Sequence, residues 1–319
     1  MSPAALETAG QVAGQAIGQA DGQADGRPAC AVFSDTGRLP FAVTEQEAPE
    51  ARIVVFGAPF DGTVSYRSGA RLGPGAIRRE FYGIETYSPI LDRDLEDRPI
   101  LDAGDLLLPP ADPAGMIRIV EDATRSFLAR GLLPVLLGGE HLVSLGAIRA
   151  AADRWPDLRV LHLDAHADTR DDYLGDRLSH ACVLRRAAES LGEGRIRSLG
   201  IRSGTRDEFE YSREHLGLLP IPADPAAARA LAADLVRDAA GRPTWLTLDL
   251  DVLDPSILPG TGTPEPGGLS FAALQAFLHG LDGLDFAGAD LVELAPDLDP
   301  TGVSTVVACR LLRELLLVL

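Results

Sequence analysis

Three residues that can bind metals, Asp164, His166 and Asp168, occupy alternate positions directly after the apolar start of LHLDAHADTR. Alternate residues of an extended backbone project to one face, so two carboxylates and an imidazole converge there. An ionised carboxylate buried without a partner costs several kcal/mol, so this group requires a nearby cation. Carboxylate and imidazole ligands suit divalent Mn, Fe, Zn or Co, and the segment therefore predicts a metal site.

Two further apolar segments end in the same residue types. Asp249 and Asp251 follow the apolar run of TWLTLDLDVLDP, and His141 closes PVLLGGEH. Taken alone, His141 fits a structural histidine, and the two aspartates fit turn or helix-cap residues. Together, three strands that end in ligand-type residues predict a parallel sheet with its binding crevice at the carboxyl ends of the strands. If two carboxylates bridge, the six residues can hold two ions.

These segments resemble the ureohydrolase (arginase–agmatinase) family of binuclear manganese enzymes. GGEH resembles the family block GG-[DE]-H, DAHAD resembles D-A-H-x-D, and LDLDVLDPSILPGTGTPEPGG resembles the long third block, which is very specific. SYRSGARLGPGAIRR and VELAPDLDPTG extend the resemblance to about residues 53–315. The chain departs from common family residues at Glu140, where many members have Asp, at Leu142 and at Thr247, which are positions for Ser.

The resemblance implies two divalent ions, carried over from the family as Mn²⁺, and assigns their ligands. One ion would take His141, Asp164, Asp168 and Asp249, and the other Asp164, His166, Asp249 and Asp251, with Asp164 and Asp249 bridging. His180 in RLSHACVLRR matches the family's proton-shuttle histidine, although a surface-loop histidine is the alternative. Glu293 in LVELAP matches the family glutamate that binds the guanidinium of the substrate. By the same resemblance, Asp168 would also accept a hydrogen bond from the attacking nucleophile.

By the same resemblance, the reaction is hydrolysis of a guanidino group to urea and an amine. The loop TRDDYLGDRLS at 169–179 lacks the Asn-rich pattern of arginases. It supplies Asp171, Asp172 and Asp176 instead, and these carboxylates favour a cationic substrate. We therefore expect an agmatinase that makes putrescine from agmatine in polyamine biosynthesis. Arg170 and Arg177 can receive a carboxylate, so arginine and 4-guanidinobutyrate stay open as substrates. A non-catalytic metal-binding relative and a binuclear phosphoesterase are the remaining alternatives.

The amino-acid composition limits which partners the protein is expected to bind and which cellular compartment it is expected to occupy. The 319 residues include 29 Lys and Arg against 47 Asp and Glu, a net charge of −18 that disfavours nucleic acid and anionic membranes as partners. Three scattered cysteines favour a reducing cytoplasm over a disulfide framework, and we read neither a signal peptide nor a membrane-spanning run. The family resemblance implies a homo-oligomer, either a trimer or a hexamer.

The order of apolar patterns predicts the fold class. Strand-like and helix-like segments alternate from about residue 52 to 317, which predicts a three-layer α/β/α domain with a mainly parallel central sheet, arginase-like by the resemblance. We expect one catalytic domain at 31–319. Residues 1–30, rich in Gly, Gln and Ala, predict a mobile low-complexity extension. Among the remaining histidines, we expect His162 to be structural and His215 and His279 to lie on helix surfaces.

Overall fold

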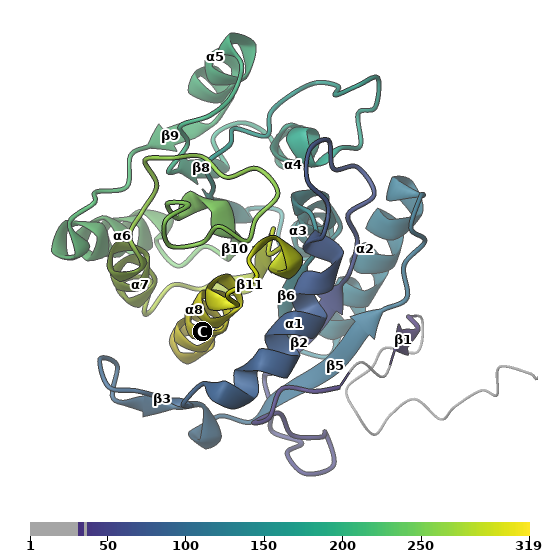
Figure 1. Ribbon diagram of the computed structural model, residues 1–319, viewed down its shortest axis with the longest axis vertical. Coiled ribbons are helices and arrows are strands. Elements are labelled where there is room, and N and C mark those ends of the chain that lie inside the picture. Colours follow the sequence, from purple (N-terminus) through teal and green to yellow (C-terminus); the bar gives the residue numbers. More distant parts are fainter. Residues whose placement is uncertain (1–30, 35–36) are drawn as a thin grey trace, which may run out of the picture.

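The computed structural model describes residues 31–34 and 37–319, and the predicted extension at 1–30 lies outside them. Within the described residues a nine-stranded sheet forms the centre of the molecule (Figure 1). Its strands are β1 (Phe33–Ser34), β2 (Ile53–Ala58), β5 (Ile100–Leu106), β6 (Leu133–Gly138), β7 (Arg159–Leu163), β8 (Ile196–Leu199), β9 (Gly217–Leu219), β10 (Thr244–Asp249) and β11 (Phe286–Val292). Their order is β1-β5-β2-β6-β11-β10-β7-β8-β9, and every neighbouring pair is parallel except β1 with β5. The short strands β3 (Tyr87–Ser88) and β4 (Arg93–Asp94) pair separately.

Helices cover both faces of this sheet. They are α1 (Gly73–Glu80), α2 (Pro113–Ala129), α3 (Ser144–Arg154), α4 (Val183–Leu191), α5 (Arg206–His215), α6 (Pro225–Ala239), α7 (Phe271–Gly280) and α8 (Val303–Val318). Short 3-10 turns are η1 (Ala70–Leu72), η2 (Phe81–Gly83), η3 (Leu95–Asp97), η4 (His141–Val143), η5 (His180–Cys182), η6 (Leu250–Val252) and η7 (Pro296–Leu298). The helices α2, α3 and α4 share one hydrophobic cluster, and α1, α6, α7 and α8 pack into the cluster on the other face. The predicted three-layer α/β/α class with a mainly parallel sheet is therefore confirmed.

Local sequence explains most of these elements. The central strands β6, β10 and β11 are buried almost throughout, as strands covered on both faces must be. Helices α1, α2 and α6 each have a proline in the first turn, where the missing N–H costs nothing. The side chains of Asp112, Asp224 and Ser270 cap α2, α6 and α7 by accepting backbone N–H groups.

One of the histidines differs from the sequence-based expectation. The prediction for His279 was wrong, because this residue is 2% exposed and its Nε2 lies 2.8 Å from the Glu314 carboxylate on α8. Helix α7 packs between α6 and α8, so little of its surface is left for solvent. Glu314 also accepts hydrogen bonds from Ser88 and Gln275, which makes this carboxylate a buried anchor for the C-terminal helix.

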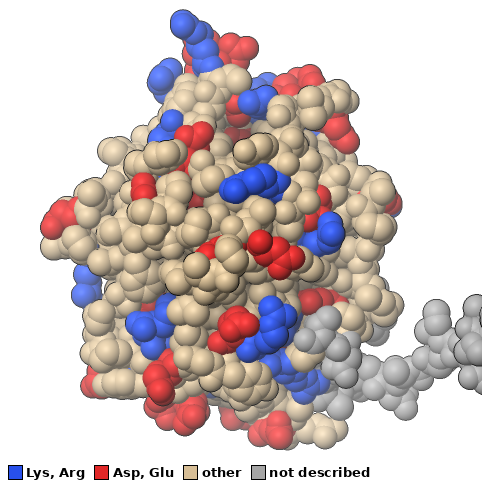
Figure 2. Space-filling view, in the orientation of Figure 1, with Lys and Arg blue, Asp and Glu red and all other residues tan. Residues whose placement is uncertain are grey.

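The outer surface carries both signs of charge. Figure 2 shows acidic and basic side chains interspersed over the face seen in Figure 1. Among the residues that the structure describes, no helix is both long enough and apolar enough to cross a bilayer.

The backbone at the end of β6 is held tightly against the end of β2. Gly139 donates its N–H to the carbonyl of Ala58 at 2.9 Å, and Glu140 donates to the carbonyl of Phe60 at 2.7 Å. A Cβ placed on Gly139 would lie 1.9 Å from the Phe60 carbonyl oxygen. Only glycine allows this approach, which fixes the backbone directly before His141.

We therefore expect Gly139→Ala to lower the free energy of unfolding by about 2–4 kcal/mol, because a methyl group must displace backbone. Gly75→Ala on α1 is the matched control, since a Cβ there meets no atom within 4 Å. It should be neutral or raise stability by about 0.5–1 kcal/mol by removing glycine entropy. Urea denaturation of both variants measures the difference, and equal midpoints would contradict the close approach.

Candidate metal centre

Four neighbouring strands bring the predicted site residues together. The strands β6, β11, β10 and β7 are adjacent in the sheet, and their carboxyl ends carry His141, Glu293, the pair Asp249 and Asp251, and the 164–168 segment. These elements are far apart in sequence, yet their carboxyl ends meet at one edge of the sheet. The crevice lies where such sheets place their ligands, as the sequence predicted.

Three carboxylates converge on one nitrogen of His141. Its Nδ1 lies 3.0 Å from Asp164 Oδ2, 3.2 Å from Asp168 Oδ2 and 3.4 Å from Asp249 Oδ2. The other ring nitrogen, Nε2, lies 2.9 Å from the hydroxyl oxygen of Thr247, which donates its proton to Asp290. Because that hydroxyl proton is committed, Nε2 is the donor to Thr247, and Nδ1 is the nitrogen directed at the carboxylates.

A second group forms around His166. Its Nδ1 lies 2.9 Å from Asp251 Oδ2 and 3.5 Å from Asp164 Oδ1. Asp164 therefore contacts both histidines through its two oxygens, which is the position a bridging ligand requires. The 164–166 backbone is fixed from the turn η6 after the neighbouring strand β10, since the N–H of Ala165 donates to Asp251 Oδ1.

His162 lies deeper along β7 and supports this group. Its Nε2 lies 2.9 Å from Asp164 Oδ2, and its Nδ1 lies 3.0 Å from Ser198 Oγ on β8. His141, His162 and Asp164 are close enough to hold an ion by distance alone. Because both ring nitrogens of His162 are already engaged, we assign it to orienting the Asp164 carboxylate.

The charges of this cluster call for a cation. Burial, reinforced by neighbouring carboxylates, raises the pKa of Asp249 well above its usual range and that of Asp168 to about 7. Despite burial, the surrounding imidazoles hold the pKa of Asp164 well below its usual range. His141 Nδ1 and Asp251 Oδ2 are buried without a hydrogen bond, although carboxylate or imidazole atoms lie within 2.9–3.4 Å of each. Carboxylate oxygens and imidazole nitrogens grouped in this way are the donor set that divalent ions bind, so the residues fit such ions.

Two residues of the site adopt left-handed backbone conformations. Asp168 has φ 50° and Glu293 has φ 66°, values that residues other than glycine rarely adopt. Glu293 is held there because its N–H donates to the Gly139 carbonyl at 2.9 Å while its Oε1 accepts the His141 N–H at 2.8 Å. The surrounding structure therefore overcomes local strain to aim these carboxylates.

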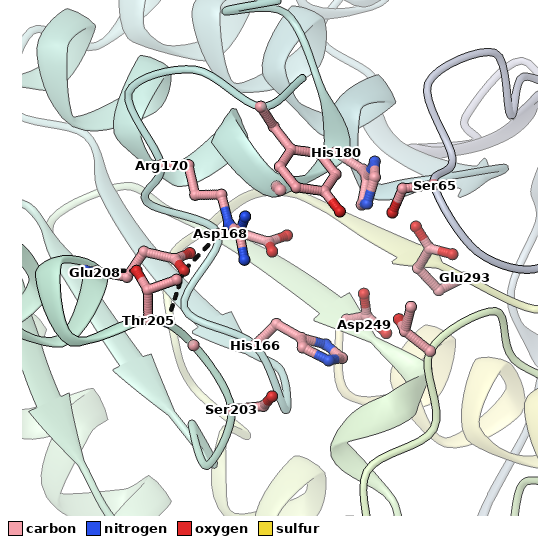
Figure 3. A pocket seen from close by; sticks show the side chains of 14 residues that line it. Ser65, His166, Asp168, Arg170, His180, Ser203, Thr205, Glu208, Asp249 and Glu293 are labelled. Carbon is pink, nitrogen blue, oxygen red and sulfur yellow. Dashed lines mark hydrogen bonds and ion pairs between the residues drawn. The ribbon is translucent and has the colours of Figure 1, made fainter. Parts of the chain in front are cut away.

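A cavity of about 280 Å³ opens over this cluster. Its lining comprises Ser65, His166, Asp168, Arg170, Tyr173, His180, Ala181, Ser203, Gly204, Thr205, Glu208, Asp249, Thr263 and Glu293. Figure 3 shows His180, Ser65 and Glu293 at one end of the cavity and Glu208 with Thr205 at the other. Burial, the largest cause, lowers the pKa of His180 to about 4, so its imidazole is neutral at neutral pH.

The acidic loop at 169–179 has a different role from the one expected. Asp171 pairs with Arg177 at 2.8 Å and with Arg186 at 2.6 Å. Asp172 and Asp176 accept backbone N–H groups of their own loop. Among the described residues that line the cavity, this loop contributes Arg170 and Tyr173 but none of its aspartates.

The carboxylate that sequence reasoning missed is Glu208. It is 5% exposed, and its Oε2 accepts the Thr205 N–H at 2.8 Å and lies 3.2 Å from Arg170 Nε. The sequence signal was the Thr-x-x-Glu pattern at 205–208, which forms a capping box at the start of α5. A capping box by itself predicts only a helix start, so its place in the cavity required the tertiary structure.

Known proteins resemble this chain over most of its length. A family model described as the arginase family matches residues 51–318. The agmatinase of Bacillus subtilis (strain 168) is 42% identical over 282 residues, which cover 87% of this chain and 95% of that protein. A guanidinobutyrase of Pseudomonas aeruginosa is 33% identical, with 88% and 91% covered. The solved structure of agmatine ureohydrolase of Thermoplasma volcanium aligns with a TM-score of 0.78 at 34% identity, covering 90% of this chain and 95% of that one.

Metal-free protein should lose stability as pH rises from 5 to 8. The pKa of Asp168 is raised to about 7 and that of Asp249 is raised well above its usual range, so both stay neutral when folded at pH 5 but are ionised in the unfolded chain. The folded state therefore binds more protons, and its stability is lost as pH rises from about 4 through 7. The pKa of His166, raised to about 12, acts in the same direction above pH 6.5.

Thermal unfolding of chelator-treated protein at several pH values measures this effect, and a stability that increases over this range would refute it. Added divalent metal should raise the melting temperature more at pH 8 than at pH 5, because the ligands must be deprotonated to bind.

His141→Ala should lower the bound metal to about one ion per chain, because three carboxylates lose the imidazole on which they converge. Elemental analysis after dialysis is the measurement. His215→Ala is the control, since that histidine lies on α5, where it contacts Glu193 and Glu214. Two retained equivalents in the His141 variant would contradict its role as a ligand.

Proposed function

Because the chain belongs to the arginase family, we propose that it hydrolyses a guanidino compound to urea and an amine, with agmatine as substrate and putrescine as the amine product. The observation that carries this proposal is the polarity of the cavity. Each end of the cavity has a buried carboxylate. Glu293 lies beside the group of predicted metal ligands (the metal-type cluster), and Glu208 lies at the other end (Figure 3). A substrate with a guanidinium at one end and an ammonium at the other complements both.

We assign the metal ligands as the sequence resemblance implies. His141, Asp164, Asp168 and Asp249 would hold one divalent ion, and Asp164, His166, Asp249 and Asp251 the other, with Mn²⁺ as the proposed metal. When bound, two such ions supply Lewis acidity and lower the pKa of water toward neutrality. The convergence of the carboxylates on His141 and the contact of Asp164 with both histidines support the assignment. Asp168 borders the cavity, where it can accept a hydrogen bond from the attacking group.

Glu293 is proposed to bind the guanidinium. Its Oε1 is occupied by the His141 N–H, and the residue borders the cavity. Burial and the neighbouring Glu140 raise its pKa well above the usual range, so a cation beside it is needed to keep the carboxylate ionised. A planar guanidinium provides that charge together with donors directed at a carboxylate.

His180 is proposed to carry a proton to the leaving amine. A guanidinium has a poor leaving group unless its nitrogen is protonated, so the reaction requires an acid near the substrate. The imidazole borders the cavity at the same end as Glu293. Because its pKa is depressed, it accepts a proton only transiently and releases it readily. The presence of both groups beside the metal-type cluster disfavours a non-catalytic relative.

Glu208 is proposed to receive the ammonium end of the substrate. Its contacts with Thr205 and Arg170 both fall on Oε2, which leaves Oε1 for a ligand. Arg170 supports a second candidate function, because its guanidinium lies over the Tyr173 ring and also lines the cavity. If Arg170 faced the ligand, the site would select a guanidino acid such as 4-guanidinobutyrate.

We further propose that residues 31–319 form one catalytic domain and that the protein acts in the cytoplasm, in polyamine biosynthesis, as a homo-trimer or homo-hexamer. The family match at 51–318 supports the domain extent. Cys182 and Cys309 are buried and free, which is compatible with a reducing compartment. Light scattering at working concentration measures the assembly, and a monomeric mass would contradict it.

With Mn²⁺-loaded protein, kcat/KM should be highest for agmatine among agmatine, arginine and 4-guanidinobutyrate. Glu208→Gln should lower kcat/KM for agmatine by about 10–100-fold, because one charge contact in a desolvated site is lost. It should change kcat/KM for 4-guanidinobutyrate by less than about threefold, since that substrate has no ammonium. Urea release measures all three substrates.

Glu210→Gln is the matched control, because Glu210 lies exposed on the same helix and should leave every substrate unaffected. If a guanidino acid is the best substrate, Arg170 binds the carboxylate of that substrate and the agmatine assignment fails. The ureohydrolase reaction itself would then stand.

A further inference from the structure

Glu140 is a fully buried carboxylate to which the proposed reaction assigns no direct contact with the substrate. It precedes His141 in sequence, but its side chain is bonded to Thr63 in the loop after β2. Its Oε2 accepts the Thr63 N–H at 2.9 Å, and its Oε1 accepts the Thr63 hydroxyl at 2.6 Å. Two hydrogen bonds to one residue hold this threonine in a single orientation.

The Thr63 hydroxyl also contacts the proposed proton carrier. Its oxygen accepts the backbone N–H of His180 at 3.0 Å and lies 3.4 Å from Nδ1 of the same residue. A hydroxyl has a single proton, and here that proton is donated to Glu140. Toward His180, the Thr63 oxygen can therefore act only as an acceptor.

This constraint selects one form of the neutral imidazole. The ring nitrogen facing Thr63 finds an acceptor, so the proton is favoured on Nδ1, and Nε2 keeps its lone pair. The hydroxyl of Ser179 lies 3.3 Å from Nδ1 and can take either role, so Thr63 is the contact that decides between the two tautomers. With Nδ1 directed at these two oxygens, Nε2 is the nitrogen left for the cavity that His180 borders.

We propose that Glu140, acting through Thr63, is a positioning residue that keeps the His180 proton on Nδ1 and leaves Nε2 to exchange protons with the reacting groups. The inference rests on the proposed function, since it requires His180 to carry a proton during turnover. The competing explanation is that the Glu140–Thr63 pair only anchors the loop after β2.

Thr63→Val removes the hydroxyl while keeping the shape, and Thr63→Ser keeps the hydroxyl. We expect Thr63→Val and Glu140→Gln to lower kcat by about 10–100-fold, with KM changed by less than about threefold and bound metal unchanged, because only the proton transfer is impaired. Thr63→Ser should stay within about threefold of wild type. A serine variant as slow as the valine variant would overturn the proposal.

A double-mutant cycle separates positioning from anchoring. In a His180→Ala background there is no imidazole to orient, so adding Thr63→Val should lower kcat by less than about twofold. A loop anchor would act independently of the imidazole. If the valine substitution slows the His180→Ala variant as much as it slows wild type, the proposal is wrong.

A readout independent of turnover distinguishes this inference from the proposed function. In Zn²⁺-loaded, ¹⁵N-labelled full-length protein, the ring nitrogens of His180 report the tautomer directly, with assignment by comparison to His180→Ala. We expect the proton on Nδ1 in wild type and Thr63→Ser, and a shift toward Nε2 in Thr63→Val. An unchanged tautomer in the valine variant would overturn the positioning role, whereas a protein without turnover on any guanidino compound would refute the function alone.

Discussion

Negative charge concentrated in a buried site is the constraint on which the rest of the structure depends. Asp164, Asp168, Asp249 and Asp251 lie together at the carboxyl ends of central strands, with the imidazoles of His141, His162 and His166 in contact with them. Carboxylates in such an environment must be protonated or paired with a cation, because water no longer solvates them. The raised pKa values of Asp168 and Asp249 beside the lowered pKa of Asp164 are the electrostatic consequence of crowding these carboxylates into one buried site.

The scaffold meets this constraint with rigid backbone rather than with flexible loops. Gly139 allows β6 and the end of β2 to lock together, and Glu293 bridges β11 to β6 from a left-handed conformation. Arg202 donates to the backbone carbonyls of residues 251, 252 and 253, which holds the turn that carries Asp251. Ligand atoms positioned in this way need little rearrangement when a metal binds, and that preorganisation makes a charged buried cluster tolerable.

The cavity also places buried carboxylates where a cationic ligand can pair with them. Glu293 and Glu208 lie at its two ends, and the protein engages one carboxylate oxygen of each. The His141 N–H donates to Glu293, whereas Thr205 and Arg170 contact Glu208. On the proposed function, chemistry and selectivity would be separated in space, with the guanidinium bound beside Glu293 and the ammonium bound at Glu208, which lies at the other end of the cavity (Figure 3). Relatives that resemble this chain include an agmatinase and a guanidinobutyrase, and a change confined to the Arg170–Glu208 end offers a physical route between such preferences.

Local patterns in the sequence by themselves determined most of the elements and the metal-binding residue types. Alternating ligands at 164–168, apolar runs before Asp249 and His141, and prolines in first turns are short-range signals, because periodicity and capping act between near neighbours. The sequence did not indicate that β11 lies between β6 and β10, nor that His141 meets Glu293 across 152 positions. The contact of Glu140 with Thr63, the place of Glu208 in the cavity and the burial of His279 likewise follow from strand order and helix packing. Those are set by the summed burial of apolar surface over the whole chain, which no local pattern encodes.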